Sequence, residues 1–256
     1  MFDSIGFIGA GRIAHIMLGG WQKAGTALPA MLVFDASADA VAALQAAFPQ
    51  VRAASLEEVA AQALVFVALH PPVMSETLAK IAPHLRRDAV LVSLAPKLRL
   101  PALQQALGGF GRLARMNPNA TSIIAQGFNP LSFSADLPEE ARAALLSTLA
   151  PLGAAPVVAD EQIETYAVVS AMGPTYFWFQ FDALRQQAEE FGLSPEAARE
   201  TLRTILHGAV DTLFASDLPP ARVMDLVPVR PLAADEDAIR AMLRERVGGI
   251  HAKLAS

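Results

Sequence analysis

The sequence predicts an α/β chain whose first half forms a parallel sheet and whose second half is helical. Three observations support this prediction. Short apolar runs alternate with helical patterns of about a dozen residues in the first half. A glycine-rich turn joins the first run to the first helix. After residue 158 the strand signals fade and only helical patterns follow.

Strands that are covered on both faces of a sheet are continuous apolar runs. Such runs predict strands at 4–8, 31–34, 64–69, 89–94, 111–116 and 123–128. The intervening segments have the apolar spacing of helices, at 13–24, 39–48, 56–62, 73–85 and 138–152.

The second half contains three helical patterns, at 161–190, 195–215 and 235–254. Ser194 suits the N-cap of the middle helix, and Pro195 its first position. The proline-rich segment 217–237 is expected to be a long loop. We therefore expect one domain over 1–155 and a second over 156–256.

Composition excludes several classes of protein. With 53% hydrophobic and 18% charged residues, the chain is not disordered. A net charge of −5 and a pI near 5.5 argue against nucleic-acid partners. The uncharged stretch 165–181 is short for a membrane span and contains proline, so a buried helix in a core or subunit interface is expected.

The chain has no cysteine, which excludes disulfides and thiolate metal sites. The first residues lack the basic segment of a signal peptide, and a cytoplasmic location is expected. No metal site is expected, because the histidines outside the strand ends have no partners at ligand spacing: His15, His84, His207 and His251.

Residues 9–14 read Gly-Ala-Gly-Arg-Ile-Ala and fit the pattern G-x-G-x-x-A. They follow a predicted strand and open a predicted helix, as the dinucleotide fingerprint requires. Gly9 permits the tight turn, and Gly11 lets a pyrophosphate approach the backbone at the helix N-terminus. The first half is therefore predicted to be a Rossmann dinucleotide-binding domain.

Asp35 stands 21 residues after Ala14, at the end of the second strand. An acid at this place binds the hydroxyls of the adenine ribose and repels a 2′-phosphate. This favours NAD over NADP. Arg12 lies in the loop and is able to reach a phosphate, so both cofactors stay open.

Five segments occur in a defined order: 5–11 Ile-Gly-Phe-Ile-Gly-Ala-Gly, 68–71 Ala-Leu-His-Pro, 92–95 Val-Ser-Leu-Ala, 115–119 Arg-Met-Asn-Pro-Asn and 170–176 Ser-Ala-Met-Gly-Pro-Thr-Tyr. Together they resemble the pyrroline-5-carboxylate reductase family over about residues 4 to 215. The resemblance implies a Rossmann domain followed by an all-α dimerisation domain. It also implies a homodimer or larger homo-oligomer, a small-molecule substrate, hydride transfer from a nicotinamide to a cyclic imine, and a role in proline biosynthesis.

The resemblance places the nicotinamide near the strand ends at 68–71 and 94–97, and the substrate near the helix that begins at Gly173 of a partner subunit. The cofactor-binding residues are expected to be Gly6, Ile8, Gly9, Ala10, Gly11, Arg12, Ile13, Asp35, Ser55, Ala68, Leu69, His70, Pro71, Leu94 and Ala95. The substrate-binding residues are expected to be Asn119, Ser170, Gly173, Pro174 and Thr175.

Three side chains are candidates for catalysis. His70 lies at a strand end, and its reference pKa of ~6.5 suits proton donation. Tyr176 is a second proton donor, although its aromatic neighbours also suit packing. Glu164 matches an acidic residue near the family's substrate pocket, or it forms a structural salt bridge, because a buried carboxylate needs a partner.

Departures from the family concentrate in the substrate half. The family has a Ser-Pro-Gly-Gly-Thr-Thr segment that holds the substrate carboxylate, and this chain has Val-Met-Asp-Leu-Val at 223–227. Lys97 replaces a glycine, His70 a lysine and Ala120 a threonine. Lys97 either binds an anion or is a solvated loop residue. The expected substrate is therefore a cyclic imine other than pyrroline-5-carboxylate.

Three other functions stay open. A dinucleotide-binding sensor without catalysis would also lack the family's carboxylate-binding segment. A β-hydroxyacid-type dehydrogenase shares the opening motif, but the helical pattern at 161–190 has no lysine, which that class places there. A deazaflavin-dependent reductase shares the glycine-loop fold, although Asp35 suits an adenine ribose better.

Overall fold

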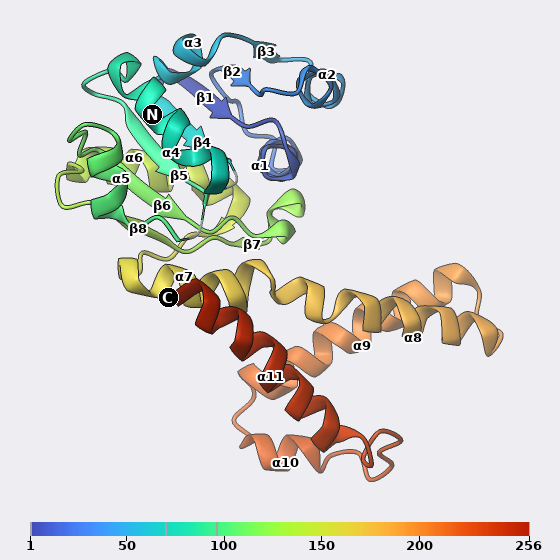
Figure 1. The fold of residues 1–256 in the computed structure, drawn as a ribbon. Helices are drawn as coiled ribbons and strands as arrows, with labels where there is room; N and C mark the ends of the chain where they lie inside the picture. The colour runs from blue at the N-terminus through green and yellow to red at the C-terminus, as the bar shows by residue number, and fades with distance from the viewer. Residues whose placement is uncertain (1, 70, 96, 256) are drawn as a thin grey trace. The chain divides into compact units, whose positions relative to one another are not determined.

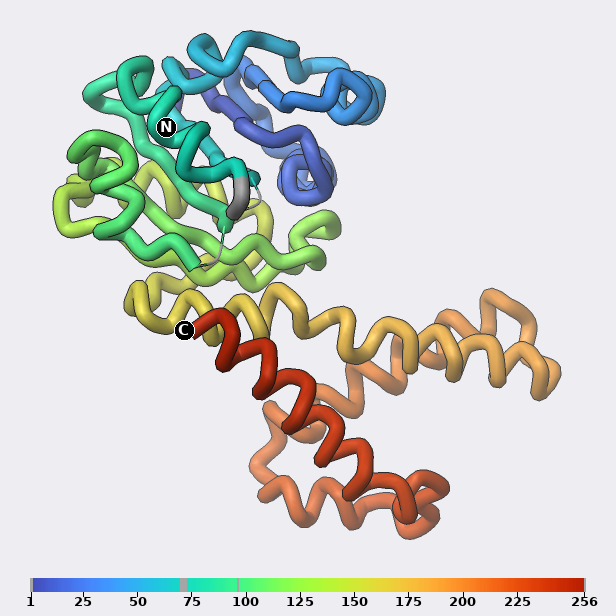
Figure 2. Tube along the Cα trace, viewed as in Figure 1, coloured from blue at the N-terminus to red at the C-terminus, as the bar shows by residue number. Residues whose placement is uncertain are grey.

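The computed structural model describes residues 2–69, 71–95 and 97–255, which form two compact units (Figure 1). Unit 1 comprises Met1–Met172 and Ile250–Ser256, and unit 2 comprises Gly173–Gly249. The chain therefore leaves unit 1 once and returns to it near the C-terminus, as the trace in Figure 2 shows. The functional division at residue 155 stays a prediction.

A seven-stranded sheet lies at the centre of unit 1, with strand order β3-β2-β1-β4-β5-β6-β8. The first six strands are parallel and have the order of a doubly wound dinucleotide-binding fold. The last strand pairs antiparallel with β6. The bounds are β1 Ser4–Ile8, β2 Ala30–Phe34, β3 Val51–Ala53, β4 Leu64–Val67, β5 Val90–Ser93, β6 Leu113–Met116 and β8 Leu131–Phe133, with a separate short pair, β7 Gly127–Phe128 and β9 Gly153–Ala154.

Helices cover both faces of this sheet. They are α1 Arg12–Lys23, α2 Ala38–Ala47, α3 Leu56–Ala60, α4 Pro71–Ile81, α5 Leu100–Ala106 and α6 Glu139–Leu149, and a further short helix, α7 Ile163–Tyr166, follows β9 in the chain. Shorter turns are η1 Ala82–His84, η2 Ala120–Ile124, η3 Ala150–Leu152, η4 Asp160–Gln162 and the π-helical η5 Ala167–Ala171.

Strand β4 explains why its sequence is apolar at every position. Leu64 and Phe66 join one hydrophobic core, and Val65 and Val67 join the other. Successive side chains of a strand point to opposite faces, so a strand between two helical layers needs apolar residues throughout. In the first core, Trp21 packs against Phe66 and donates from Nε1 to the Thr148 carbonyl at 2.8 Å.

Unit 2 is helical and barely buries its side chains. It contains η6 Gly173–Tyr176, α8 Trp178–Glu190, α9 Pro195–Ala215, α10 Pro220–Met224 and most of α11 Glu236–Ala255. Ser194 accepts from the Ala197 N–H at 3.2 Å, which confirms the predicted N-cap. Of the side chains described between 173 and 249, only Ala198 is fully buried.

Two predicted elements are wrong. Of the expected strand at 123–128, only Gly127–Phe128 is a strand, and its first two residues end the turn η2, which Asn119 caps by accepting from the Thr121 N–H at 2.9 Å. The expected helix at 161–190 is interrupted around Gly173 and Pro174, since proline lacks the N–H that a helix interior requires. In addition, the predicted loop at 217–237 contains α10, and strands β3 and β8 and helix α5 were not predicted.

Candidate cofactor and active site

The glycine loop lies between β1 and α1. Gly9 has φ +113°, and a Cβ there would come within 2.6 Å of the Ala68 carbonyl oxygen, so only glycine fits. A Cβ on Gly11 would meet no atom within 4 Å. The backbone at Gly11 therefore faces open space at the N-terminus of α1, where free N–H groups attract an anion.

Asp35 follows β2 and is held beside this loop. Its Oδ2 accepts from the Ala10 N–H at 2.8 Å, and its Oδ1 accepts from the Ser37 N–H at 2.9 Å. These two bonds fix the carboxylate while leaving further lone pairs for ligand hydroxyls. The spacing of Gly9 to Ala14 and Asp35 in the sequence thus brings loop and acid together.

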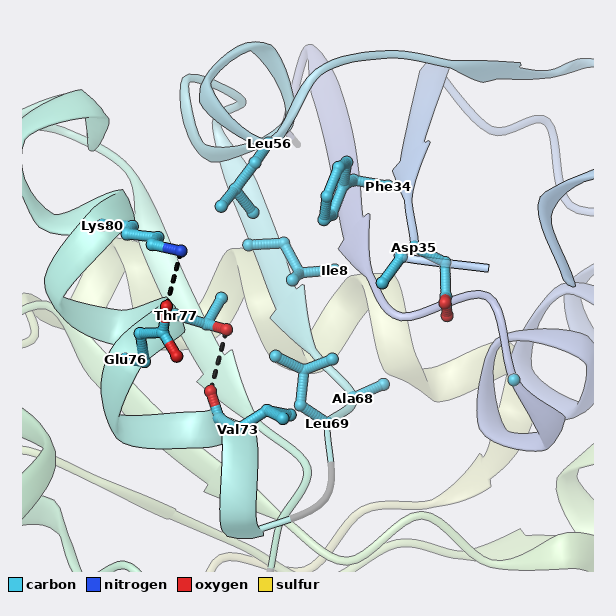
Figure 3. A pocket seen from close by; sticks show the side chains of 12 residues that line it. Ile8, Phe34, Asp35, Leu56, Ala68, Leu69, Val73, Glu76, Thr77 and Lys80 are labelled. Carbon is cyan, nitrogen blue, oxygen red and sulfur yellow. Dashed lines mark hydrogen bonds and ion pairs between the residues drawn. The ribbon is translucent and has the colours of Figure 1, made fainter. Parts of the chain in front are cut away.

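A pocket with a volume of about 480 Å³ opens beside Asp35 (Figure 3). Its lining residues come from the loop, the ends of β1, β2 and β4, and helices α3 and α4: Ile8, Gly11, Phe34, Asp35, Ala36, Leu56, Ala68, Leu69, Val73, Glu76, Thr77 and Lys80. Apolar walls with one fixed carboxylate suit an adenine ring and its ribose.

Two polar contacts order the α4 wall of the pocket. The Lys80 ammonium lies 2.7 Å from Glu76 Oε1, and its hydrogen bond lowers the pKa of Glu76 (Figure 3). Thr77 Oγ1 donates to the Val73 carbonyl at 2.9 Å. Lys80, the cation among the described lining residues, is therefore already paired with Glu76, and Asp35 is the acid among them without a cation partner.

The residues present fit a nicotinamide dinucleotide. Gly11 provides backbone space for a pyrophosphate, and Asp35 stands where an adenosine ribose would bind. When bound, such a cofactor supplies a hydride to an electrophilic carbon.

Some of the residues predicted to bind the cofactor line the pocket or form the glycine loop. Ile8, Gly11, Asp35, Ala68 and Leu69 line the pocket, and Gly9 and Ala10 form the loop that holds Asp35. His70 lies outside the described residues, as does the side chain of Pro71.

Other predicted cofactor residues do not line this pocket. Gly6 packs closely against α3, because a Cβ there would lie 2.5 Å from the Val59 carbonyl. Ser55 caps α3, and Leu94 and Ala95 are core residues. Arg12 is exposed to solvent, and Ile13 packs beside the core. The sequence interpretation missed the α4 wall, although positions 73, 76, 77 and 80 have the spacing of one helix face.

A buried charge cluster joins β6 to the segment after β9. Arg115 is fully buried, with Nη1 2.7 Å from Asp160 Oδ1 and Nη2 2.5 Å from Glu164 Oε1. Asp160 Oδ1 also accepts from Ser132 Oγ at 3.0 Å, and its Oδ2 from the Leu100 N–H at 3.1 Å. Glu164 Oε2 has no hydrogen-bond partner in the described structure. Glu164 thus forms the salt bridge that its burial required.

Asn119 and Ser170 are brought together. Asn119 Nδ2 donates to the Ser170 carbonyl at 2.7 Å, and Ser170 Oγ donates to the Phe128 carbonyl at 2.8 Å. Both predicted substrate residues therefore bind backbone within unit 1. Gly173, Pro174 and Thr175 belong to η6 of unit 2.

Tyr176 closes η6, and its ring centroid lies 6.4 Å from that of Phe177. Partial burial raises the pKa of the Tyr176 phenol. The phenol therefore carries its proton throughout the neutral range, which is the state a proton donor needs. No group of three metal-ligating side chains gathers within the described ranges.

Two family models match the chain in succession. Residues 4–97 match the family described as NADP oxidoreductase coenzyme F420-dependent, and residues 160–255 match pyrroline-5-carboxylate reductase dimerisation. The pyrroline-5-carboxylate reductase of Pseudomonas aeruginosa is 30% identical over 93% of this chain and 87% of its own length. The chain belongs to the pyrroline-5-carboxylate reductase family. The Escherichia coli reductase is 29% identical over 94% of this chain and 90% of its length.

The fold agrees with this family. The NADP-bound pyrroline carboxylate reductase of Plasmodium falciparum superposes with a TM-score of 0.84 at 17% identity, covering 99% of this chain and 97% of its own. The family and the glycine-loop pocket make this chain an NAD(P)-dependent oxidoreductase with a C-terminal dimerisation domain. The described part of the chain offers no helix with the length and apolar character of a membrane span.

Proposed function

We propose that this protein uses NADH to reduce the C=N bond of a small cyclic imine other than pyrroline-5-carboxylate. The observation that carries the cofactor assignment is the Asp35 carboxylate, fixed on the Ala10 and Ser37 amides at the edge of the pocket. A 2′-phosphate placed against this acid would be repelled, whereas ribose hydroxyls would donate to it. Lys80, the nearby cation among the described lining residues, lies 2.7 Å from Glu76 Oε1 and so is already engaged.

In this reaction the residues of the pocket bind and orient the cofactor. The loop at Gly11 receives the pyrophosphate, Asp35 fixes the ribose, and Ile8 and Leu69 exclude water from the pocket. Tyr176, whose pKa is raised by burial, is the proton donor we favour among described residues. His70 remains the alternative donor from the strand end, and Glu164 the third candidate.

The substrate assignment rests on unit 2. Residues 223–224 end α10, and residues 225–227 follow it. Met224, Leu226 and Val227 are about half exposed, and Asp225 lies among them in the sequence. This segment offers no hydroxyl, and Asp225 would repel a carboxylate. The segment therefore supports a substrate that is held differently from the family's own. Substrate contacts from Gly173, Pro174 and Thr175 stay part of this proposal.

The proposed assembly is a homodimer or larger homo-oligomer through unit 2, in the cytoplasm. The exposed apolar side chains of α8 and α9 support this, because a free monomer seldom exposes so many. The absence of cysteine is consistent with a reducing compartment.

A titration with NADH and NADPH, followed by nicotinamide fluorescence, tests the proposal. The protein should bind NADH more tightly than NADPH. Asp35→Ala should weaken the binding of NADH about tenfold and reduce the difference in affinity between NADH and NADPH. Asp39→Ala, an exposed acid on the next helix, is the matched control and should change neither affinity. Equal binding of both cofactors by the unaltered protein would refute the NADH preference.

Turnover tests the substrate. With NADH present, 1-pyrroline, 1-piperideine and their carboxylated forms should include a substrate better than pyrroline-5-carboxylate. Tight NADH binding without reduction of any imine or carbonyl compound would instead favour a dinucleotide sensor, a function that the replaced segment at 223–227 also suits.

A further inference from the structure

The pocket beside Asp35 has charged side chains at two ends. Asp35 stands at one end, and Glu76 and Lys80 stand at the other (Figure 3). The side chains of Ile8 and Phe34 lie between them. A nucleotide whose ribose hydroxyls donate to Asp35 would therefore extend its base across apolar residues toward the two charged groups. Apolar side chains suit the flat faces of a base, which leaves Glu76 and Lys80 for its polar edge.

Helix α4 carries this pair and is anchored on the sheet. Glu76 and Lys80 are four residues apart, so their side chains lie on the same face of the helix. Thr77 also lines the pocket, but its Oγ1 donates to the Val73 carbonyl of the same helix. The side chains that anchor another face of α4 are buried in the second hydrophobic core: Met74, Leu78 and Ile81. The wall therefore holds the pair on a fixed backbone.

Glu76 and Lys80 bind each other and still have hydrogen-bonding capacity for a ligand. The Lys80 ammonium lies 2.7 Å from Glu76 Oε1, and the two side chains are 61% and 73% exposed. An ammonium has three N–H donors and a carboxylate has about four lone-pair sites, so their mutual bond uses only part of each. The same bond lowers the pKa of Glu76, which is therefore ionised at neutral pH and only accepts. The wall presents an acceptor beside a donor.

Adenine is the purine whose edge matches this arrangement. Its exocyclic N6 donates hydrogen bonds, and the ring nitrogens beside it accept them. Guanine and hypoxanthine have a carbonyl oxygen in place of that amino group, and this oxygen accepts. A carbonyl oxygen placed against the Glu76 carboxylate would leave two acceptors facing each other without a proton between them, which costs binding free energy.

We propose that Glu76 and Lys80 select the base of the bound dinucleotide, in that a Glu76 oxygen accepts from adenine N6–H and the Lys80 ammonium donates to a neighbouring ring nitrogen. The inference rests on the proposed use of NADH and adds a second level of cofactor specificity to it. Asp35 distinguishes a 2′-hydroxyl from a 2′-phosphate, whereas Glu76 and Lys80 distinguish adenine from hypoxanthine and guanine.

Calorimetry with the full-length protein and three nucleoside diphosphates tests this selection directly. Adenosine, inosine and guanosine 5′-diphosphate have the same ribose and pyrophosphate and differ only in the base. Adenosine diphosphate should bind about tenfold more tightly than either of the other two. Equal affinities, a preference for inosine or guanosine diphosphate, or no binding of adenosine diphosphate at millimolar concentration would overturn the proposal.

Variants assign the contacts. Glu76→Gln introduces an amide that both accepts and donates, so the affinities for adenosine and inosine diphosphate should come within about threefold of each other. Lys80→Met should weaken adenosine diphosphate about fivefold. Neither change should unfold the chain, because both side chains are exposed. Glu139→Gln is the matched control, an exposed acid that pairs with Arg142 on α6, and it should alter no affinity. Full discrimination between the bases in Glu76→Gln would overturn the assignment.

Turnover with NADH and with reduced nicotinamide hypoxanthine dinucleotide separates this inference from the proposed function. If adenosine diphosphate binds about tenfold more tightly than inosine diphosphate and no imine is reduced, the proposed function fails and the base selection stands. If imines are reduced equally well with both dinucleotides and the diphosphates bind equally, the base selection fails and the proposed function stands.

Discussion

Unit 1 and unit 2 differ in how they bury apolar side chains. In unit 1 the largest hydrophobic residue, Trp21, is 0% exposed within a core that stretches from β1 to α6. In unit 2 the helices expose theirs, with Phe214 at 79% and Phe179 at 66%. Apolar side chains thus form a buried core in unit 1 and an exposed surface in unit 2.

This difference indicates two sources of stability. Unit 1 gains its burial within a single chain, from helices on both faces of the sheet. Unit 2 exposes many large apolar side chains, which is unusual for a monomer and suits burial against other polypeptide. Its match to a dimerisation family indicates a second copy of the chain. The two regions should therefore respond differently to substitution.

The largest expected effect is on assembly. Val210 and Phe214 are 54% and 79% exposed and lie one turn apart on α9. Their joint replacement by aspartate should convert a dimer of twice the chain mass of 27.1 kDa to monomer. Light scattering after size-exclusion chromatography measures this. Glu200→Gln on the same helix is the control, and a double variant that stays dimeric would exclude this face from the interface.

The next effect tests the interior of unit 1. Arg115→Met leaves Asp160 and Glu164 buried without their cation, which should cost about 3–5 kcal/mol of unfolding free energy. Arg86→Met removes an exposed pair with Asp88, which water and salt screen, and should lower the free energy of unfolding far less. Urea denaturation compares the two. Similar losses would show that burial does not decide the strength of these pairs.

Two helix caps sharpen the comparison. Ser55 caps α3 in unit 1, and Ser194 caps α9 in unit 2. Each alanine variant should lose about 1 kcal/mol. Thermal unfolding at several protein concentrations distinguishes them: the loss from Ser194→Ala should vary with concentration because unit 2 is stabilised by assembly, and the loss from Ser55→Ala should not. Identical concentration dependence would contradict the division into two stability sources.

The smallest effect concerns the backbone at Lys97. Lys97 has φ +80°, a conformation that costs non-glycine residues energy, so Lys97→Gly should raise the free energy of unfolding by roughly 0.5–1 kcal/mol. Ala125→Gly, at φ +60°, should give a similar gain and serves as the matched variant. Chemical denaturation measures both. A loss of stability in Lys97→Gly alone would mean that its side chain stabilises unit 1.

Local patterns in the sequence predicted the parallel sheet and the cofactor loop. Strands β1, β4 and β5 are apolar throughout because two helical layers cover them, and Asp35 follows β2 at the spacing that the loop requires. Strand β8 was not predicted, because Leu131–Phe133 is only three residues long and the polar Ser132 interrupts its apolar pattern. Its antiparallel pairing with β6 depends on a tertiary contact that no local pattern shows.

The charge cluster illustrates the same limit at the site. Arg115 lies 45 residues from Asp160 and 49 from Glu164. Their residue types suggested a buried pair for Glu164, but only the fold identifies Arg115 as the partner. The faces of unit 2 that need a partner are likewise invisible to periodicity, which shows a helix but not which chain covers it.

The return of the C-terminus to unit 1 has a consequence for how the chain responds to cutting. Residues 250–256 belong to unit 1, where His251 Nε2 lies 3.0 Å from Thr165 Oγ1. Unit 2 is thus a loop anchored at both ends. After a single protease cut between α10 and α11, each fragment would still have an end within unit 1. Removal of the last seven residues would instead leave unit 2 connected to unit 1 at one end, with greater conformational entropy.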